Sequence, residues 1–133
     1  MSGKANKKMK ESDDLKEFIS VIKRAEAAKV YINDIIYIES EARRIHIYTA
    51  DDKYSIYRKM DEIAEKLPAD FYRCHKSCII NLSKVKNMKE RLIYFECGAA
   101  LSVCAEKYTK AVQAYKGYLI RNEKHKERVT KKA

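Results

Sequence analysis

β-Branched and aromatic residues crowd the middle of this chain of 133 residues, and this constrains the fold more than any other feature of the sequence. Between Val30 and Ser40 most positions carry valine, isoleucine or tyrosine, which are enriched in strands. From Arg44 to Tyr57 polar and apolar residues roughly alternate on either side of a polar turn, Ala50–Lys53, and this pattern predicts a β-hairpin. Further strands are predicted over Cys78–Leu82, Leu92–Glu96 and Ala100–Cys104.

Helical periodicity marks three other segments. The spacing of Leu15, Phe18, Ile19, Ile22 and Ala25 predicts an amphipathic helix over Ser12–Ala28. A short helix is predicted over Lys59–Leu67, because Pro68 cannot continue the hydrogen-bond ladder. A last helix is predicted over Glu106–Arg121, followed by a polar tail that we expect to fray. The fold class is therefore mainly β, with N- and C-terminal helices and a short helix at one side.

Length and composition indicate one domain without a metal or disulfide staple. Hydrophobic residues make up 46% of the chain, which is enough for a buried core. With only three glycines and one proline, few positions favour a flexible linker. No apolar run approaches the ~18 residues of a membrane span, and the first ten residues lack the apolar core of a signal peptide. We therefore expect a soluble, cytoplasmic protein in which the four cysteines are thiols.

Catalytic and metal-binding patterns are weak. Cys74, His75 and Cys78 are close in sequence, but Cys97 and Cys104 are poorly spaced for a second pair of zinc ligands. Buried thiols in a strand-rich core explain these cysteines better, although pairing of Cys74 or Cys78 with Cys97 or Cys104 depends on distances that the sequence does not give. We expect no metal, no cofactor and no enzymatic activity.

The charge points to a polyanionic partner. The formal net charge is +10, and residues 121–133 alone contribute +4. A basic tail can also be no more than a solvated end, so charge by itself favours nucleic acid only weakly.

Three blocks carry a family resemblance. Residues 71–82, FYRCHKSCIINL, are joined by YINDIIYIES at 31–40 and KERLIYFECG at 89–98. In this order they resemble the LytTR DNA-binding domain, the mostly β module that ends many bacterial response regulators. The matched positions in the first block are Phe71, Arg73, His75, Ser77, Ile80, Asn81 and Leu82.

The resemblance implies an elongated stack of small antiparallel sheets and a function as a bacterial transcription regulator that binds double-stranded DNA. Because we see no upstream signalling domain in the 133 residues, we expect the regulator to act without a receiver domain. It covers residues 29–110, between an N-terminal tail and helix at 1–28 and a helix continuation and basic tail at 111–133. Loops at strand ends would enter the major groove, where long side chains can reach base edges. The implied base contacts are Arg43, Arg44, His46 and Lys76, and the implied phosphate contacts are Arg73, Ser77, Lys89, Arg91 and Lys107.

One position departs from the family, two matched positions have a structural explanation, and one alternative function remains open. Many relatives carry an arginine after the last strand, where this chain offers only Lys107. His75 and Asn81 are better explained as residues that hold the turn by hydrogen bonds than as base contacts. The expected partners are DNA, a second copy on direct repeats and a regulatory protein. The alternative is a protein-interaction module on the same fold, with weak or non-specific DNA binding, which uses the stripes Leu15-Phe18-Ile19-Ile22 and Tyr108-Val112-Tyr115-Leu119.

Overall fold

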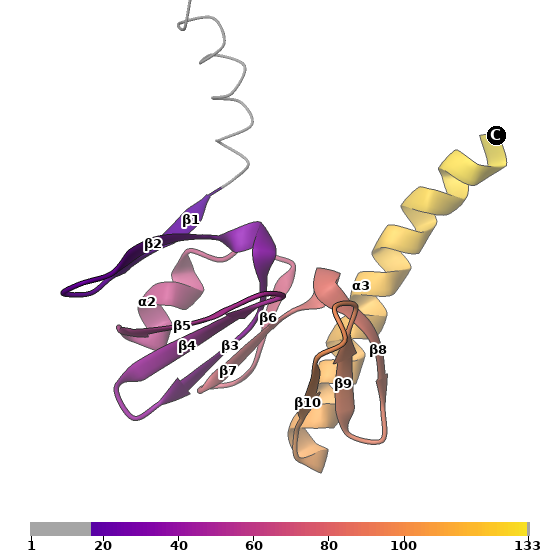
Figure 1. The fold of residues 1–133 in the computed structure, drawn as a ribbon. Coiled ribbons are helices and arrows are strands. Elements are labelled where there is room, and N and C mark those ends of the chain that lie inside the picture. Colours follow the sequence, from indigo (N-terminus) through magenta and orange to yellow (C-terminus); the bar gives the residue numbers. More distant parts are fainter. Residues whose placement is uncertain (1–16, 133) are drawn as a thin grey trace, which may run out of the picture.

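A computed structural model describes the main chain of residues 17–132 and the side chains of residues 17–123. Within this range ten strands form three separate antiparallel sheets, and the predicted mainly β class is confirmed (Figure 1). The sheets have two, five and three strands. In the described part of the chain, no helix has the length and apolar character needed to cross a membrane.

The first sheet is a hairpin of β1 (Phe18–Ile22) and β2 (Ala27–Tyr31). The helix predicted over Ser12–Ala28 is therefore wrong across β1, while its start, with Leu15, lies outside the described residues. Ile19 and Val21 are almost fully buried whereas their neighbours are exposed, which is the period of a strand. Over so short a segment the same apolar residues fit both the helical period of 3.6 and the strand period of 2. The pairing with β2 makes this segment a strand.

The central sheet has the strand order β5-β4-β3-β7-β6. The hairpin predicted over 44–57 is confirmed as β4 and β5, and the strand predicted over 30–40 is divided between β2 and β3 by a 3-10 turn at Ile32–Asp34. The sequence patterns did not predict β6. The five strands are β3 (Ile35–Glu41), β4 (Arg44–Thr49), β5 (Lys53–Tyr57), β6 (Phe71–His75) and β7 (Cys78–Asn81).

The third sheet follows a second 3-10 turn, Leu82–Lys84, and comprises β8 (Val85–Lys89), β9 (Leu92–Phe95) and β10 (Ala100–Ser102). The C-terminal helix α3 (Ala105–Lys132) begins where predicted but continues well beyond Arg121. It packs on this sheet through Tyr115, whose hydroxyl donates to the carbonyl of Val85 at 2.8 Å. The distal half of α3 extends away from the sheets (Figure 1).

Two hydrophobic cores hold the layers together. One core joins the central sheet to the β1–β2 hairpin and to the short helix α2 (Met60–Glu65), and it contains the fully buried Ile38 and Ile63. The other core joins the opposite face of the central sheet to the three-stranded sheet and α3. Tyr37 bridges the sheets, because its ring stacks on Tyr48 at 4.4 Å and on Phe95 at 5.5 Å between centroids.

Candidate nucleic-acid interface

Four connections lie along one edge of the molecule: the β3–β4, β6–β7 and β8–β9 turns and the β10–α3 junction (Figure 1). We call this set the turn edge. The first two connections are adjacent because β3 and β7 are antiparallel neighbours, and the Ser40 amide donates to the Ser77 carbonyl at 2.9 Å. The last two are also tied together, since the Val103 amide donates to the Arg91 carbonyl at 3.1 Å.

The β3–β4 turn consists of Ala42 and Arg43, with Ala42 at a φ of 59°. A non-glycine residue in this left-handed region carries a cost of ~1 kcal/mol or more, which the strand pairing on both sides must offset. The result is a two-residue turn that leaves Arg43 exposed at the end of the sheet. The family resemblance implies a base contact for Arg43, and its exposed position suits that role.

Arg43 and Lys76 line one hollow together, although they belong to different turns. This Arg43–Lys76 hollow also receives Arg58 and Lys59, which connect β5 to α2. Among the described residues, no hydrogen bond or ion pair engages the side chain of Arg43, Lys59 or Lys76. Three cations therefore converge here without an internal partner, an arrangement that attracts an anion.

Sequence reasoning missed Arg58 and Lys59. Two consecutive cations in a connection carry no signal by themselves. The pairing of Arg44 with Tyr57 would have located them, because it sets the end of β5 beside the start of β4. The hairpin predicted over 44–57 brings its first and last residues together at one edge of the sheet. Arg58 and Lys59, which directly follow Tyr57, must therefore lie at that edge as well.

Arg73, an expected phosphate contact, is engaged internally. Its guanidinium donates to the Asp61 carboxylate at 2.7 Å and to the Lys76 carbonyl at 2.7 Å. These bonds fasten the β6–β7 turn to the start of α2, so the geometry favours a positioning role for Arg73.

Ser77 is occupied in a similar way. Its hydroxyl lies 2.7 Å from His75 Nδ1, and its amide donates to the same nitrogen at 3.3 Å. Because this nitrogen accepts from the amide, the hydroxyl hydrogen has an internal acceptor and is not available to a phosphate oxygen. Partial burial, and then the positive charges of Lys107, Lys76 and Arg73, lower the pKa of His75, which favours the neutral, accepting imidazole.

His46 does not have the position expected of a base contact. The residue is only 7% exposed, with Nδ1 at 2.7 Å from the Ser55 hydroxyl and Nε2 at 3.1 Å from the Glu41 carboxylate. The alternation in β4 placed His46 on a polar face, but that face of the sheet is covered as well. Both ring nitrogens are therefore engaged within the protein.

Arg44 lies over the ring of Tyr57 at 5.2 Å and donates to its hydroxyl from Nε and Nη2, each at 3.2 Å. Both side chains are exposed, so Arg44 keeps donor groups free for an external ligand. Arg44 does not line the Arg43–Lys76 hollow but lines a neighbouring depression, which shares Tyr57 and Arg58 with it.

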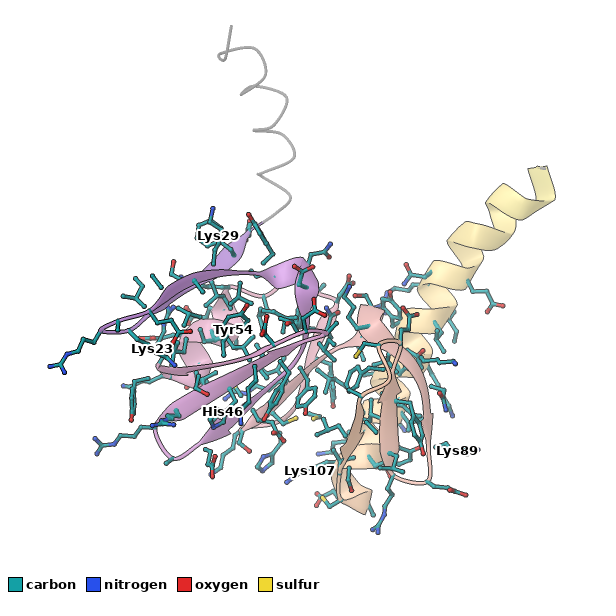
Figure 2. All side chains as sticks on the ribbon, viewed as in Figure 1. Lys23, Lys29, His46, Tyr54, Lys89 and Lys107 are labelled. Atoms are coloured by element: carbon teal, nitrogen blue, oxygen red, sulfur yellow. The ribbon has the colours of Figure 1, made fainter. Side chains whose placement is uncertain are left out.

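The remaining cations lie farther along the turn edge. Lys89 and Arg91 are exposed around the β8–β9 turn, in which Glu90 and Arg91 both have a positive φ, of 55° and 66°. Lys107 is half-buried at the start of α3 and shares a hollow with His75 and Ser77. Figure 2 shows Lys89 and Lys107 on the three-stranded side of the edge.

The structure brings together no alternative chemical site in its described part. Cys74 and Cys78 are buried and Cys97 and Cys104 exposed, all as free thiols. Hydrogen bonding to Cys74, and then burial, raises the pKa of the Cys78 thiol, which disfavours a reactive thiolate. No group of three His, Cys, Asp or Glu side chains has the arrangement of a metal site among the residues described. Asn81 has the structural role expected, because its amide donates to the Ile35 carbonyl at 2.8 Å.

Comparison with known proteins agrees with this geometry. The family model of the LytTr DNA-binding domain matches residues 25–117, more than half of the chain. The transcriptional regulatory protein YpdB of Escherichia coli K12 is 32% identical over 72 residues, which cover 53% of this chain and 30% of that protein. The accessory gene regulator protein A of Staphylococcus epidermidis is 32% identical over 73 residues, covering 52% of this chain and 30% of that protein.

A solved structure supports the fold. The LytTr DNA-binding domain of a Bacillus cereus response regulator superposes with a TM-score of 0.63 at 19% identity, over 77% of this chain and 98% of that one. The chain thus matches a whole domain of that structure but only about a third of the length of the curated relatives.

Proposed function

This chain belongs to the LytTr DNA-binding domain family, and on that basis we propose that it binds double-stranded DNA through the turn edge and regulates transcription. The observation that carries the proposal is the Arg43–Lys76 hollow, where two adjacent turns present unpaired cations to solvent. The major groove is wide enough to admit such turns, and Arg and Lys can both address the acceptor atoms of guanine there.

The cations of the turn edge divide into two proposed roles. Arg43 and Lys76 contact bases, because they stand at the tips of their turns and have no internal partner among the described side chains. Lys89 and Arg91 contact phosphates from the neighbouring sheet, with Lys107 between the two groups. Contacts of the second kind fix the position of the protein on the duplex and are insensitive to sequence.

Arg73, Ser77 and His46 act indirectly in this proposal. Arg73 and Ser77 set the shape of the β6–β7 turn from which Lys76 projects, and His46 links β4 to Glu41 and Ser55. Arg44 contacts DNA from the outer side of the same turn, with Tyr57 supporting its guanidinium.

A single domain contacts few base pairs, so we propose that two copies bind direct repeats side by side. A regulatory protein is a further proposed partner. The exposed Leu119 and Ile120 near the middle of α3 favour an additional protein contact there. The stripes on which an interaction module would depend are only partly used in folding, because Ile19 and Tyr115 are buried whereas Phe18, Ile22 and Leu119 are exposed.

Selection of bound fragments from a random duplex library, followed by mobility shifts, tests the proposal. We expect an enriched sequence, and we expect affinity to fall steeply between ~50 and ~200 mM salt while preference for that sequence over a scrambled duplex persists. A library in which no sequence is enriched contradicts sequence-specific regulation.

The two roles are separated by a pair of variants. Lys76→Ala should reduce the preference for the selected sequence by roughly 1–3 kcal/mol, which is about fivefold to 150-fold, because a base contact is lost. Arg91→Ala, the matched control, should weaken selected and scrambled duplexes alike and lower the salt slope by about one. The reverse pattern would show that the roles are wrongly assigned.

A further inference from the structure

A second basic depression lies beside the turn edge, between the tip of the β1–β2 hairpin and the ends of β4 and β5. We call it the hairpin hollow. Its cations are Lys23 and Arg24 from the hairpin tip, Arg44 from β4 and Arg58 after β5. In Figure 1 the hairpin tip extends outward past the end of β5, on the side of the β3–β4 turn. Lys23 is labelled in Figure 2.

The hairpin hollow is continuous with the Arg43–Lys76 hollow. Tyr57 and Arg58 line both, so that a ligand following the edge of the central sheet passes directly from one to the other. Tyr57 is 71% exposed and Ile22, at the base of the hairpin tip, is 76% exposed. These are the two most exposed large hydrophobic side chains in the described part of the chain, and both line the hairpin hollow.

Charge in the hairpin hollow is not balanced from within. Among the described residues that line it, none carries a carboxylate. Lys23 pairs with Glu26 and Arg58 with Glu62, each at 3.7 Å between exposed or partly exposed side chains, and pairs of this kind contribute only ~0–1 kcal/mol. No hydrogen bond or ion pair holds Arg24 within the side chains that the structure describes. Gathering four cations in this way opposes folding unless an anion is bound.

We propose that the hairpin hollow binds the phosphodiester backbone of the same duplex, in the flank beyond the bases contacted by Arg43 and Lys76. The inference rests on the proposed function and adds to it a second, sequence-independent anchor. Continuity with the Arg43–Lys76 hollow favours DNA as the occupant, because a stiff duplex lying along the turn edge continues past the end of the central sheet. Two of its four cations, Lys23 and Arg24, precede the family match, which starts at residue 25.

Duplex length provides the test. We would measure Kd on a short duplex that ends at the selected sequence and on a long duplex with random flanks. The variant is Lys23→Ala/Arg24→Ala, and the matched control is Lys66→Ala/Lys116→Ala, which removes two exposed cations, one directly after α2 and one on α3. Circular dichroism checks that each variant is folded.

The hairpin variant should bind the long duplex about tenfold more weakly at ~100 mM salt, with a salt slope lower by about two. It should bind the short duplex as wild type does, and its preference for the selected sequence should not change. The control variant should match wild type on both duplexes. Hydroxyl-radical footprints should show flank protection that wild type gives and the hairpin variant loses.

A further variant is expected to tighten DNA binding instead of weakening it. Glu26→Gln removes the carboxylate that partly neutralises Lys23 and should therefore tighten binding to the long duplex only. Three results overturn the inference and leave the proposed function intact. The hairpin variant binds the long duplex as wild type does, it loses equal affinity for both duplexes, or the control variant loses as much affinity as the hairpin variant. A wild-type protein that binds neither duplex overturns the proposed function itself.

Discussion

At the scale of single residues, internal hydrogen bonds separate the polar side chains of the turn edge into two groups. Lys76 and Arg73 are three positions apart in the sequence and both basic, yet only Arg73 has acceptors within the protein. His75 and Ser77 complete the same local network. A positive charge at the turn edge is therefore not sufficient for a DNA contact. The Arg73 guanidinium would have to break its hydrogen bonds to Asp61 and to the Lys76 carbonyl before it could bind a phosphate.

His75 makes this network sensitive to pH. Its pKa is lowered in the folded protein, so the folded state favours the neutral ring and stability is fully present above the unfolded-state pKa of about 6.5. As pH falls through this value, protonation would remove the acceptor for the Ser77 amide, and the free energy of unfolding should decrease.

Urea unfolding between pH 7.5 and 5.5 measures the effect, with NMR titration of the imidazole giving the pKa directly. The control is His75→Gln, whose side-chain oxygen accepts hydrogen bonds without titrating, and which should lose less stability over this range. An imidazole that titrates above the ordinary value would contradict the assignment.

At the scale of elements, the β6–β7 turn depends on a helix that is distant in sequence. Arg73 on β6 reaches Asp61 in the first turn of α2 while holding the carbonyl of Lys76. The turn that presents Lys76 is thus braced by α2, whose other side is packed into the first core through Met60 and Ile63. Precise presentation of a base-contacting residue requires such support from rigid elements.

The effect of Asp61→Asn on DNA binding distinguishes the two possible roles of Arg73, because the two roles predict changes in opposite directions. If Arg73 positions the turn, Asp61→Asn weakens the brace and should reduce preference for the selected sequence, as Arg73→Ala does. If Arg73 instead contacted a phosphate, Asp61→Asn would release the guanidinium, remove a negative charge and tighten binding to every duplex. Mobility shifts on selected and scrambled duplexes distinguish these outcomes, with Glu65→Gln on the same helix as the control.

At the scale of the whole molecule, the turn edge is assembled from two sheets that share no strand pairing. Packing of Tyr37 against Tyr48 and Phe95 joins them, together with Tyr115 of α3. Burial, and then the charge of Glu39, raise the pKa of Tyr37 to about 12. The relative placement of Lys76 and Arg91 depends on this side-chain packing, since no backbone ladder fixes it.

Removing the Tyr37 ring should therefore disturb both stability and DNA binding. We expect Tyr37→Ala to lower the free energy of unfolding by ~2–4 kcal/mol, from lost burial and lost stacking, whereas Tyr37→Phe should cost less than ~1 kcal/mol. Urea denaturation gives these values. Tyr37→Ala should also weaken binding to the selected duplex, because the two groups of cations no longer hold a fixed spacing. Equal stability of the two variants would show that the ring does not join the sheets.

The sequence by itself determined the mainly β class, the hairpin over 44–57, the short helix ended by Pro68 and the family to which the chain belongs. These features are local, since strand composition, turn residues and a motif such as that at 71–82 are set by neighbours along the chain. Only the tertiary structure decided that 18–22 is a strand, that His46 is buried, that Arg73 is engaged and that Arg24 and Arg58 share one hollow. In each case a partner outside the element itself decides the outcome, and a pattern within one segment carries no information about what packs against it.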